Sequence, residues 1–324
     1  VFDNFVWLSD AEIQAAVSQR LPHFAGLAPV AGNFPRFLTG ILEDILNQKK
    51  IKARVEARPF LDLATHRQSL IVGVVGAAAP RVCAVALSGT SGVSSSDLLA
   101  AGEPLVGSIY SKTFVASMGQ GSWTQLYRRR GYWRAAVGEP QVSLNAPAGC
   151  SGVSISVPVT EGHGYSWAGA RWHGHRAATD AELDKALGMR NGQVAAIDRI
   201  DSGLIDVERL SHSRGYLLER ASYPPALDDA ARQAVFDVTV NEDVQFHVGT
   251  VTFDGVPAAL AMDLAKKWRL KAGDVFDESA LDRFRSDAVA PLVARGEVPK
   301  TYRPSFQAVR ESPVVNIRFA PGTP

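Results

Sequence analysis

An approximate repeat of about eighty residues constrains the fold of this chain more than any other feature. The clearest copy is FHVGTVTFDGVPAALAMDLAKKWRLKAGDVF, residues 246–276, which reads as a strand, a glycine turn, an amphipathic helix and a second glycine turn. Shifting by 81 residues aligns Gly255 with Gly174 of YSWAGARWHG, and a further 85 aligns Gly174 with Gly89 of VCAVALSG. The pattern therefore predicts a series of similar units.

The first strand of each unit is predicted to contain a β-bulge. In the last copy the bulky residues form two alternating pairs, and one extra residue, Gly249, between the pairs breaks the alternation. In the copy before it, Gly169 is expected to take the bulge. A strand with one buried face changes phase in this way when a bulge inserts a residue. The bulky positions are Phe246, Val248, Val251 and Phe253 in one copy and Tyr165, Trp167, Ala170 and Trp172 in the other.

Sequence signals for the starts and ends of helices recur at the same spacing. Ser9 with Glu12 and Thr179 with Glu182 are capping boxes, and they stand 170 residues apart, twice the repeat length. Three glycines, Gly131, Gly215 and Gly296, mark the end of the second helix at spacings of 84 and 81. Chance similarity between unrelated α+β segments is the alternative. Agreement of caps, glycines and strand phase at one offset favours the repeat.

Four copies of strand, helix, helix, strand, strand account for all 324 residues. The predicted domains are 1–79, 80–162, 163–243 and 244–324. Units of about eighty residues can each bury a small core, so each is expected to fold as a domain. A composition of 46% hydrophobic and 21% charged residues is normal for globular proteins.

The order of elements predicts an α+β fold. If each connection reverses direction, the first and third strands are parallel neighbours and the second strand pairs antiparallel with the third. The result is a three-stranded mixed sheet with two helices on one face. The second strand is left as an open edge, which predicts edges at 134–144, 220–226 and 305–309.

An open edge strand can pair with another extended polypeptide through its main chain. The edge at 134–144 is the favoured client-binding site, because WRAAVGEPQVSL has no proline before Pro140, whereas Pro224 and Pro225 blunt the next edge. The candidate residues are Arg134, Ala135, Ala136 and Val137. The alternative is an edge that meets only solvent.

Several motifs resemble the polypeptide-transport-associated (POTRA) domains, the soluble N-terminal part of BamA- and TamA-like outer-membrane β-barrel assembly and transport proteins. The carrying segments are FHVGTVTFDG with KAGDVFDESALDRF, YSWAGARWHG with RGYLLERASY, and RRRGYWRAAVGEPQV; the segment 1–79 lacks the strand-ending glycine. The resemblance implies a periplasmic arm that receives unfolded outer-membrane proteins and passes them to a C-terminal barrel. The barrel is absent from this sequence, which we therefore expect to be an excised fragment. Accessory lipoproteins and periplasmic chaperones are further expected partners.

Three other classes compete with this hypothesis. A soluble adhesion or interaction scaffold of repeated α+β modules without a barrel would have a similar sequence. A cell-division protein with one such domain is disfavoured by four copies. A hydrolase with diverged repeats is disfavoured because the chain has no G-x-S-x-G elbow, and SGTSG and GQGSW lack the P-loop lysine. We therefore expect no catalytic residue and no cofactor.

Two constellations are weak candidates for chemistry. His173 and His175 could share a metal on a strand, but no third ligand is evident nearby, so we predict no metal site. Asp198, Asp201, Asp206 and Glu208 have helical spacing on the polar side of Ile200, Leu204 and Val207, which favours a solvated face. The formal charge of +1 predicts no nucleic-acid partner.

A basic cluster and a cysteine pair complete the predictions. Arg128, Arg129 and Arg130 end a helix, where cations offset the helix dipole, and they are also a candidate patch for partner carboxylates or lipid headgroups. Cys83 and Cys150 fall at the beginnings of the first and third strands of the second unit, which the topology makes neighbours. A disulfide between them is a candidate and would fit an oxidising periplasm. The alternative is one buried thiol and one loop thiol.

Overall fold

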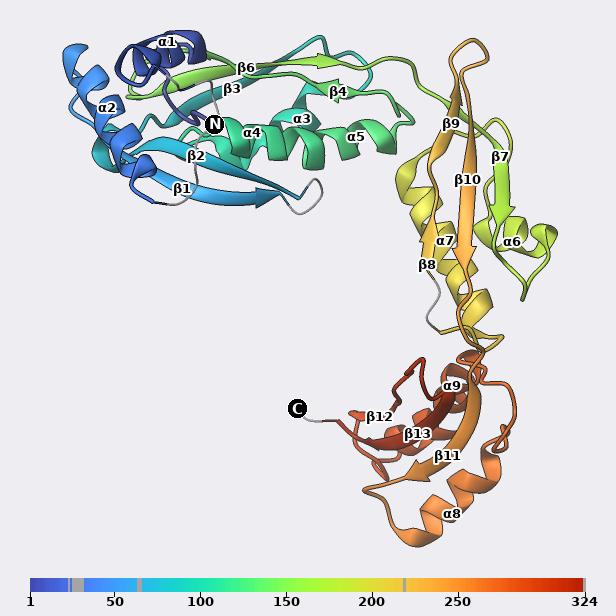
Figure 1. Cartoon of the computed structure of the whole chain (residues 1–324). Coiled ribbons are helices and arrows are strands. Elements are labelled where there is room, and N and C mark those ends of the chain that lie inside the picture. Colours follow the sequence, from blue (N-terminus) through green and yellow to red (C-terminus); the bar gives the residue numbers. More distant parts are fainter. Residues whose placement is uncertain (23, 25–31, 63–65, 218–219, 323–324) are drawn as a thin grey trace. The chain divides into compact units, whose positions relative to one another are not determined.

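The computed structural model describes residues 1–22, 24, 32–62, 66–217 and 220–322 (Figure 1). These residues form four separate sheets, one in each of the predicted ranges, which we call the first to fourth modules. Contacts group the chain into two compact units, Val1–Gly164 and Tyr165–Pro324, and each unit holds two of the sheets. The capping boxes at Ser9 and Thr179 are both formed, as predicted.

In the first module two helices pack on a β-hairpin. Its elements are α1 (Asp10–Arg20), α2 (Phe34–Gln48), β1 (Arg54–Asp62), β2 (Arg67–Val75) and a 3₁₀ turn (Gly76–Ala78). The first strand is reduced to one parallel bridge, between Phe2 and Val72. Of the two stripes that the sequence offers for α2, Leu38, Leu42 and Leu46 face the core, together with Ile45 from the other stripe, while Phe37 is 65% exposed.

The second module has a strand order of β3-β6-β4, with β5 also paired to β6. Val153, Ile155, Val157 and Val159 of β6 are buried on one face, as their alternation predicts. The elements are β3 (Val82–Ser88), α3 (Ser95–Gly102), a 3₁₀ turn (Glu103–Leu105), α4 (Lys112–Met118), a π-helical turn (Gly119–Trp123), α5 (Thr124–Arg129), β4 (Ala136–Val137), β5 (Gln141–Ser143) and β6 (Val153–Thr160).

The third module repeats this order around β10. Trp167 stacks on Phe236 with ring centroids 4.9 Å apart, which joins the first and third strands of its sheet. The elements are β7 (Ser166–His173), α6 (Asp180–Leu187), α7 (Ile197–His212), β8 (Arg220–Ser222), β9 (Pro225–Asp228) and β10 (Gln233–Asn241).

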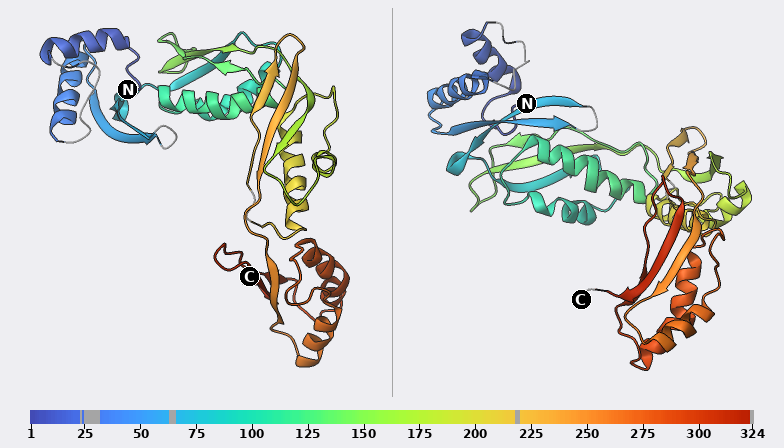
Figure 2. Two further views of the ribbon diagram at one scale, coloured as in Figure 1. Left: turned by 45° about the vertical axis from the view of Figure 1, so that its right-hand side comes forward. Right: turned by 60° about the horizontal axis from the view of Figure 1, so that its bottom comes forward.

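The fourth module has the strand order β11-β13-β12, and its helices lie on one side of β11 and β13 (Figure 2). Phe253, Phe284 and Phe319 form an aromatic cluster between helices and sheet. The elements are β11 (His247–Phe253), α8 (Ala258–Lys267), α9 (Ser279–Phe284), a π-helical turn (Arg285–Val289), α10 (Ala290–Ala294), β12 (Tyr302–Ser305) and β13 (Val314–Pro321).

The predicted α+β topology is confirmed. β3 with β6, β7 with β10 and β11 with β13 are parallel, and the intervening strands pair antiparallel with the third. The predicted helix-ending glycines Gly131, Gly215 and Gly296 all have positive φ, which a residue without a Cβ adopts readily.

The first strand of the last three modules contains the expected bulge. The register skips one residue between Val82 and Ala84 and between Trp167 and Gly169, and it shifts again between Val248 and Val251. The extra residue is therefore Cys83 in β3 and Ala168 in β7, and Gly249 occupies the same repeat position in β11. The predicted bulge residue Gly169 is wrong, because Gly169 pairs with Val235.

Candidate protein-binding edges

The predicted edge at 134–144 forms two short strands rather than one. Only Ala136 and Val137 belong to β4, while Arg134 and Ala135 precede it. The N–H of Gly138 donates to Pro158 O at 2.8 Å, and pairing with β6 resumes only at β5, after Pro140. A proline lacks the N–H that a ladder needs, so the edge is interrupted here.

The other two predicted edges are also short. The range 220–226 is divided into β8 and β9 by Tyr223 and Pro224, as the prolines led us to expect. In the fourth module the predicted range 305–309 is wrong, because β12 is Tyr302–Ser305. Tyr302 is buried in the core, so the strand begins earlier in the chain than predicted.

The longest of these second strands is β1 in the first module, which the sequence reasoning did not single out. All nine residues pair with β2, from Arg54 with Val75 to Asp62 with Arg67. Within the described ranges β1 pairs with no other strand, so its second side is an edge, but the N–H of Val55 already donates to Glu43 at 2.8 Å and Pro59 has no N–H to offer. Phe60 and Leu61 are 51% and 48% exposed near the end of this edge. Strand length and these apolar residues were the signals available in the sequence.

A buried carboxylate closes the end of the second module's sheet. Glu161, 8% exposed, accepts hydrogen bonds from the N–H groups of Ser91 and Gly92 and from the hydroxyls of Ser91 and Tyr127. Burial raises the pKa of Glu161, but the hydrogen bonds from Ser91, Gly92 and Tyr127 outweigh it and bring the pKa to about 2. Glu161 is therefore ionised and anchors the turn after β3.

The third module repeats this carboxylate anchor. Glu242, also buried, accepts hydrogen bonds from the N–H groups of Arg176 and Ala177 at 2.7 and 3.0 Å. Both glutamates follow the last strand of their module and bind the turn that follows the first strand. Sequence reasoning missed them, although their spacing of 81 residues matches the repeat.

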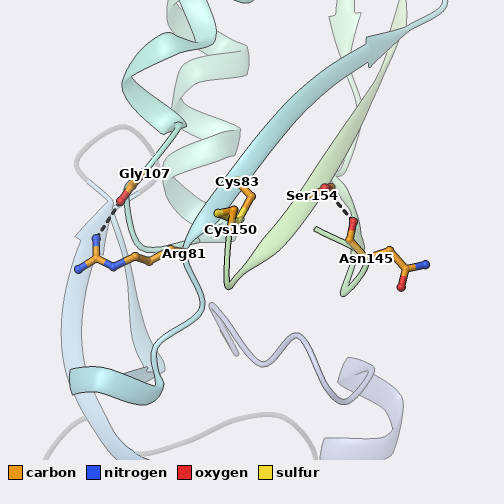
Figure 3. The surroundings of a disulfide bond; sticks show 6 residues. All are labelled: Arg81, Cys83, Gly107, Asn145, Cys150 and Ser154. Atoms are coloured by element: carbon orange, nitrogen blue, oxygen red, sulfur yellow. Dashed lines mark hydrogen bonds between the residues drawn. A yellow bond between two sulfur atoms is a disulfide. The ribbon is translucent and has the colours of Figure 1, made fainter. Parts of the chain in front are cut away.

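The structure places a disulfide between Cys83 and Cys150 (Figure 3). Their Cα atoms are 6.0 Å apart, within the range of protein disulfides. Cys83 is the bulged residue of β3, and Cys150 lies in the loop just before β6. The bond therefore ties the start of the first strand to the approach to the third.

The three predicted basic residues lie at the end of α5. The guanidinium of Arg128 stands over the ring of Trp133, 5.5 Å from its centroid, while Arg129 and Arg130 are exposed. The cluster is four residues before the candidate edge at Arg134, in the same module. Its role as a patch for carboxylates or headgroups stays a prediction.

The candidate metal and carboxylate groups have separate partners. His175 contacts Ala178 O and Asp180, and His173 lies 3.7 Å from Asp237. Asp206 pairs with Arg209, and Tyr223 donates to Asp201. Across the described ranges, no group of three or more His, Cys, Asp or Glu side chains is placed to hold a metal. No helix in those ranges has both the length and the apolar character needed to cross a bilayer.

No protein-family model matches the chain. Among the solved structures that match the chain are arrays of POTRA domains, the family that the sequence motifs resemble. The third to fifth POTRA domains of Haemophilus influenzae BamA match at 19% identity and a TM-score of 0.49, covering 74% of this chain and 95% of that chain. The first three POTRA domains of Anabaena Omp85 match at 14% identity and a TM-score of 0.34, covering 74% and 94%.

Proposed function

We propose that the chain is a receptor arm whose open sheet edges bind extended segments of unfolded polypeptides. The observation that carries this proposal is the nine-residue strand β1, which pairs along its whole length with β2 and with no other strand within the described ranges. Unpaired backbone N–H and C=O groups along an edge accept another strand. Such pairing reads little sequence, which suits a receptor for many clients.

The exposed apolar residues of β1 would strengthen this pairing. Phe60 and Leu61 are neighbours in sequence and point to opposite faces of the sheet, so a strand added at β1 contacts both. Burial of such side chains is worth about 1.5–3 kcal/mol each. We propose the predicted edge at Arg134–Val137 as a second, shorter site, because β4 offers only Ala136 and Val137 in strand conformation.

We further propose that the arm works in the periplasm beside an outer-membrane barrel. The resemblance of its motifs to POTRA domains supports this location, and a disulfide between Cys83 and Cys150 suits an oxidising compartment. The proposed clients are unfolded outer-membrane proteins. Accessory lipoproteins or periplasmic chaperones would be partners.

Binding of a strand-forming peptide to the matched variants Phe60→Lys and Phe37→Lys tests this proposal. The probe is a fluorescent decapeptide of alternating valine and threonine. We expect Phe60→Lys to weaken binding by about tenfold, the equivalent of about 1.4 kcal/mol, because it removes an apolar contact at the edge. Phe37 is exposed on α2 of the same module, so Phe37→Lys should bind as the wild type does.

Photo-crosslinking locates the bound strand. A benzophenone side chain at Arg58 of β1 should label the peptide strongly, and one at Ala136 of β4 should label it more weakly. Equal binding by both lysine variants, with no labelling from either position, would contradict edge pairing.

A further inference from the structure

The fourth module carries a groove that edge pairing does not explain. The groove has a volume of about 540 Å³ and lies where α8 ends beside α9 and the π-helical turn. The lining residues come from these helices and from the loop after α8. They are Lys267, Trp268, Arg269, Leu270, Ala280, Arg283, Phe284, Asp287 and Ala288.

Aromatic side chains form the apolar part of this groove. The Trp268 ring packs edge-on against Phe284, with centroids 5.2 Å apart, and against Phe319 at 5.7 Å. These contacts hold the indole in place, so the apolar surface is preformed.

The indole N–H of Trp268 differs from that of two other buried tryptophans. Trp123 donates to Leu98 O at 2.9 Å and Trp172 donates to Asp184 at 2.8 Å. Trp268 Nε1 is buried but has no acceptor among the described residues. A buried donor without an acceptor costs about 1–3 kcal/mol. Because Nε1 is closed to solvent, a ligand in the groove would contact the ring of Trp268 and not this N–H.

The rim of the groove is positively charged. Lys267 and Arg269 are exposed, and neither forms an ion pair with any described residue. Arg283 binds Asp277 at 2.6 Å and Ser279 at 2.7 Å, so its charge is already offset. Asp287 is the one carboxylate among the described lining residues. Two unpaired cations therefore face an incoming group, which favours an anion.

A π-helical turn shapes one wall. Residues Arg285–Val289 depart from α-helical geometry, and two of them, Asp287 and Ala288, line the groove. Such turns occur often at functional sites. The second module has a π-helical turn at the equivalent repeat position, Gly119–Trp123, whereas α7 of the third module is α-helical throughout.

We propose that this groove binds an acidic, amphipathic segment of a protein partner. One apolar side chain would enter beside Trp268 and Phe284, and carboxylates would face Lys267 and Arg269. This site selects its ligand by charge and side chain, whereas the edge strands select extended backbone. It goes beyond the proposed function, because it can bind a folded partner as well as an unfolded client.

Two synthetic dodecapeptides test the proposal by NMR of the ¹⁵N-labelled chain. One alternates glutamate with leucine and phenylalanine, and the other has lysine in place of every glutamate. We expect the acidic peptide to bind at least tenfold more tightly and to move the indole cross-peak of Trp268, identified with Trp268→Phe. The cross-peaks of Trp123 and Trp172, which already have acceptors, should stay in place. Added salt should weaken binding, because it screens exposed charges.

Charge-reversal variants distinguish binding in the groove from non-specific attraction of the acidic peptide to a positively charged surface. Lys267→Glu with Arg269→Glu should abolish binding of the acidic peptide. The matched control, Lys185→Glu with Lys300→Glu, makes the same change in net charge at exposed residues away from the groove and should bind normally. The Phe60→Lys variant should also bind normally, which distinguishes this site from β1.

Three outcomes would overturn the proposal. They are failure of the acidic peptide to bind, equal loss of binding in the two charge-reversed variants, and shifts confined to β12. Binding of the chain to vesicles with anionic phosphatidylglycerol that disappears with Lys267→Glu and Arg269→Glu, when the acidic peptide does not bind, would identify a lipid surface instead.

Discussion

The carboxylate of Glu161 accepts the backbone N–H of Gly92 at 2.9 Å, joining the end of β6 to the turn that follows β3. These residues are 69 positions apart in sequence. β3 and β6 are parallel, so both strands end on the same side of the sheet. The carboxylate that follows β6 can therefore bind the turn that follows β3.

Glu161→Gln should destabilise the unit Val1–Gly164. The variant loses the charge that strengthens several hydrogen bonds, and we expect a loss of about 2 kcal/mol. Urea unfolding measures it, with Glu139→Gln, an exposed residue of the same module, as the control. Because the folded pKa of Glu161 is lowered to about 2, its stabilisation is complete above the ordinary pKa of 4.5 and is lost as the pH falls toward 2. A stability difference that does not narrow below pH 4.5 would contradict this assignment.

Reduction of the disulfide should lower the stability of the second module. Cys83 and Cys150 are separated by 67 residues, and closing a loop of this length in the unfolded chain corresponds to about 4 kcal/mol. Calorimetry with and without reductant measures the change, and the transition of Tyr165–Pro324 serves as an internal control. The unfolded, unreduced chain should show no reactive thiol. Two reactive thiols before reduction would exclude the bond.

Gly89→Ala should destabilise the second module more than Gly107→Ala. Both glycines have positive φ, +77° and +80°, so both substitutions introduce about 1 kcal/mol of backbone strain. A Cβ at Gly89 would lie 2.4 Å from Val159 O, whereas one at Gly107 meets nothing within 4 Å. The difference between their unfolding free energies measures the close approach alone. Equal values would show that the turn after β3 relaxes.

The pair formed by His212 and Glu278 should stabilise the unit Tyr165–Pro324 in a pH-dependent way. His212 Nδ1 lies 2.5 Å from Glu278, and this hydrogen bond lowers the pKa of Glu278 despite burial. A lowered folded pKa means that the contribution is present above the ordinary value of 4.5 and is lost as the pH falls below it. Thermal unfolding of wild type and Glu278→Gln from pH 7 to 3 measures this. The two melting curves should converge at the acid end.

The fragment 163–243 should fold by itself if the predicted domain boundaries are right. It contains its own sheet and its own stacked pair, Trp167 and Phe236. A dispersed NMR spectrum is the expected result, with the fragment 163–324 as the reference. The N–H of Phe246 donates to Gly215 O at 2.8 Å across the predicted boundary at 243. If the short fragment is unfolded and the long one is folded, the unit of folding is a pair of modules.

Local pattern was enough to predict the strand order and the presence of bulges. The phase change in the first strands can be read from the sequence because one face of each strand is buried, and register shifts are observed in both β7 and β11. The predicted residue in β7, Gly169, was wrong by one position, because the extra residue is Ala168. The glycines at helix ends could also be predicted from the sequence, because glycine adopts a positive φ more readily than other residues.

Features that depend on tertiary packing could not be predicted. Phe37 and Leu38 both begin apolar stripes on α2, and only packing against α1 and β1 decides that Leu38 is buried and Phe37 exposed. The length of β1 can be read from its sequence, but the folded sheet alone shows that β1 pairs with β2 and with no other strand in the described ranges. In the sequence Glu161 cannot be distinguished from an ordinary loop glutamate, because the turn at Ser91 and Gly92 that it binds is distant along the chain.

The bulge position in the third module is a suitable place to engineer a disulfide equivalent to that of the second module. Cys83 occupies the extra residue of β3, and Ala168 is its counterpart in β7. Cys150 lies three residues before Val153, the partner of Val82, and Ala231 lies three before Ala234, the partner of Trp167. Cysteines engineered at Ala168 and Ala231 would thus provide a redox-controlled lock for the third module, which reductant would open together with the bond of the second module.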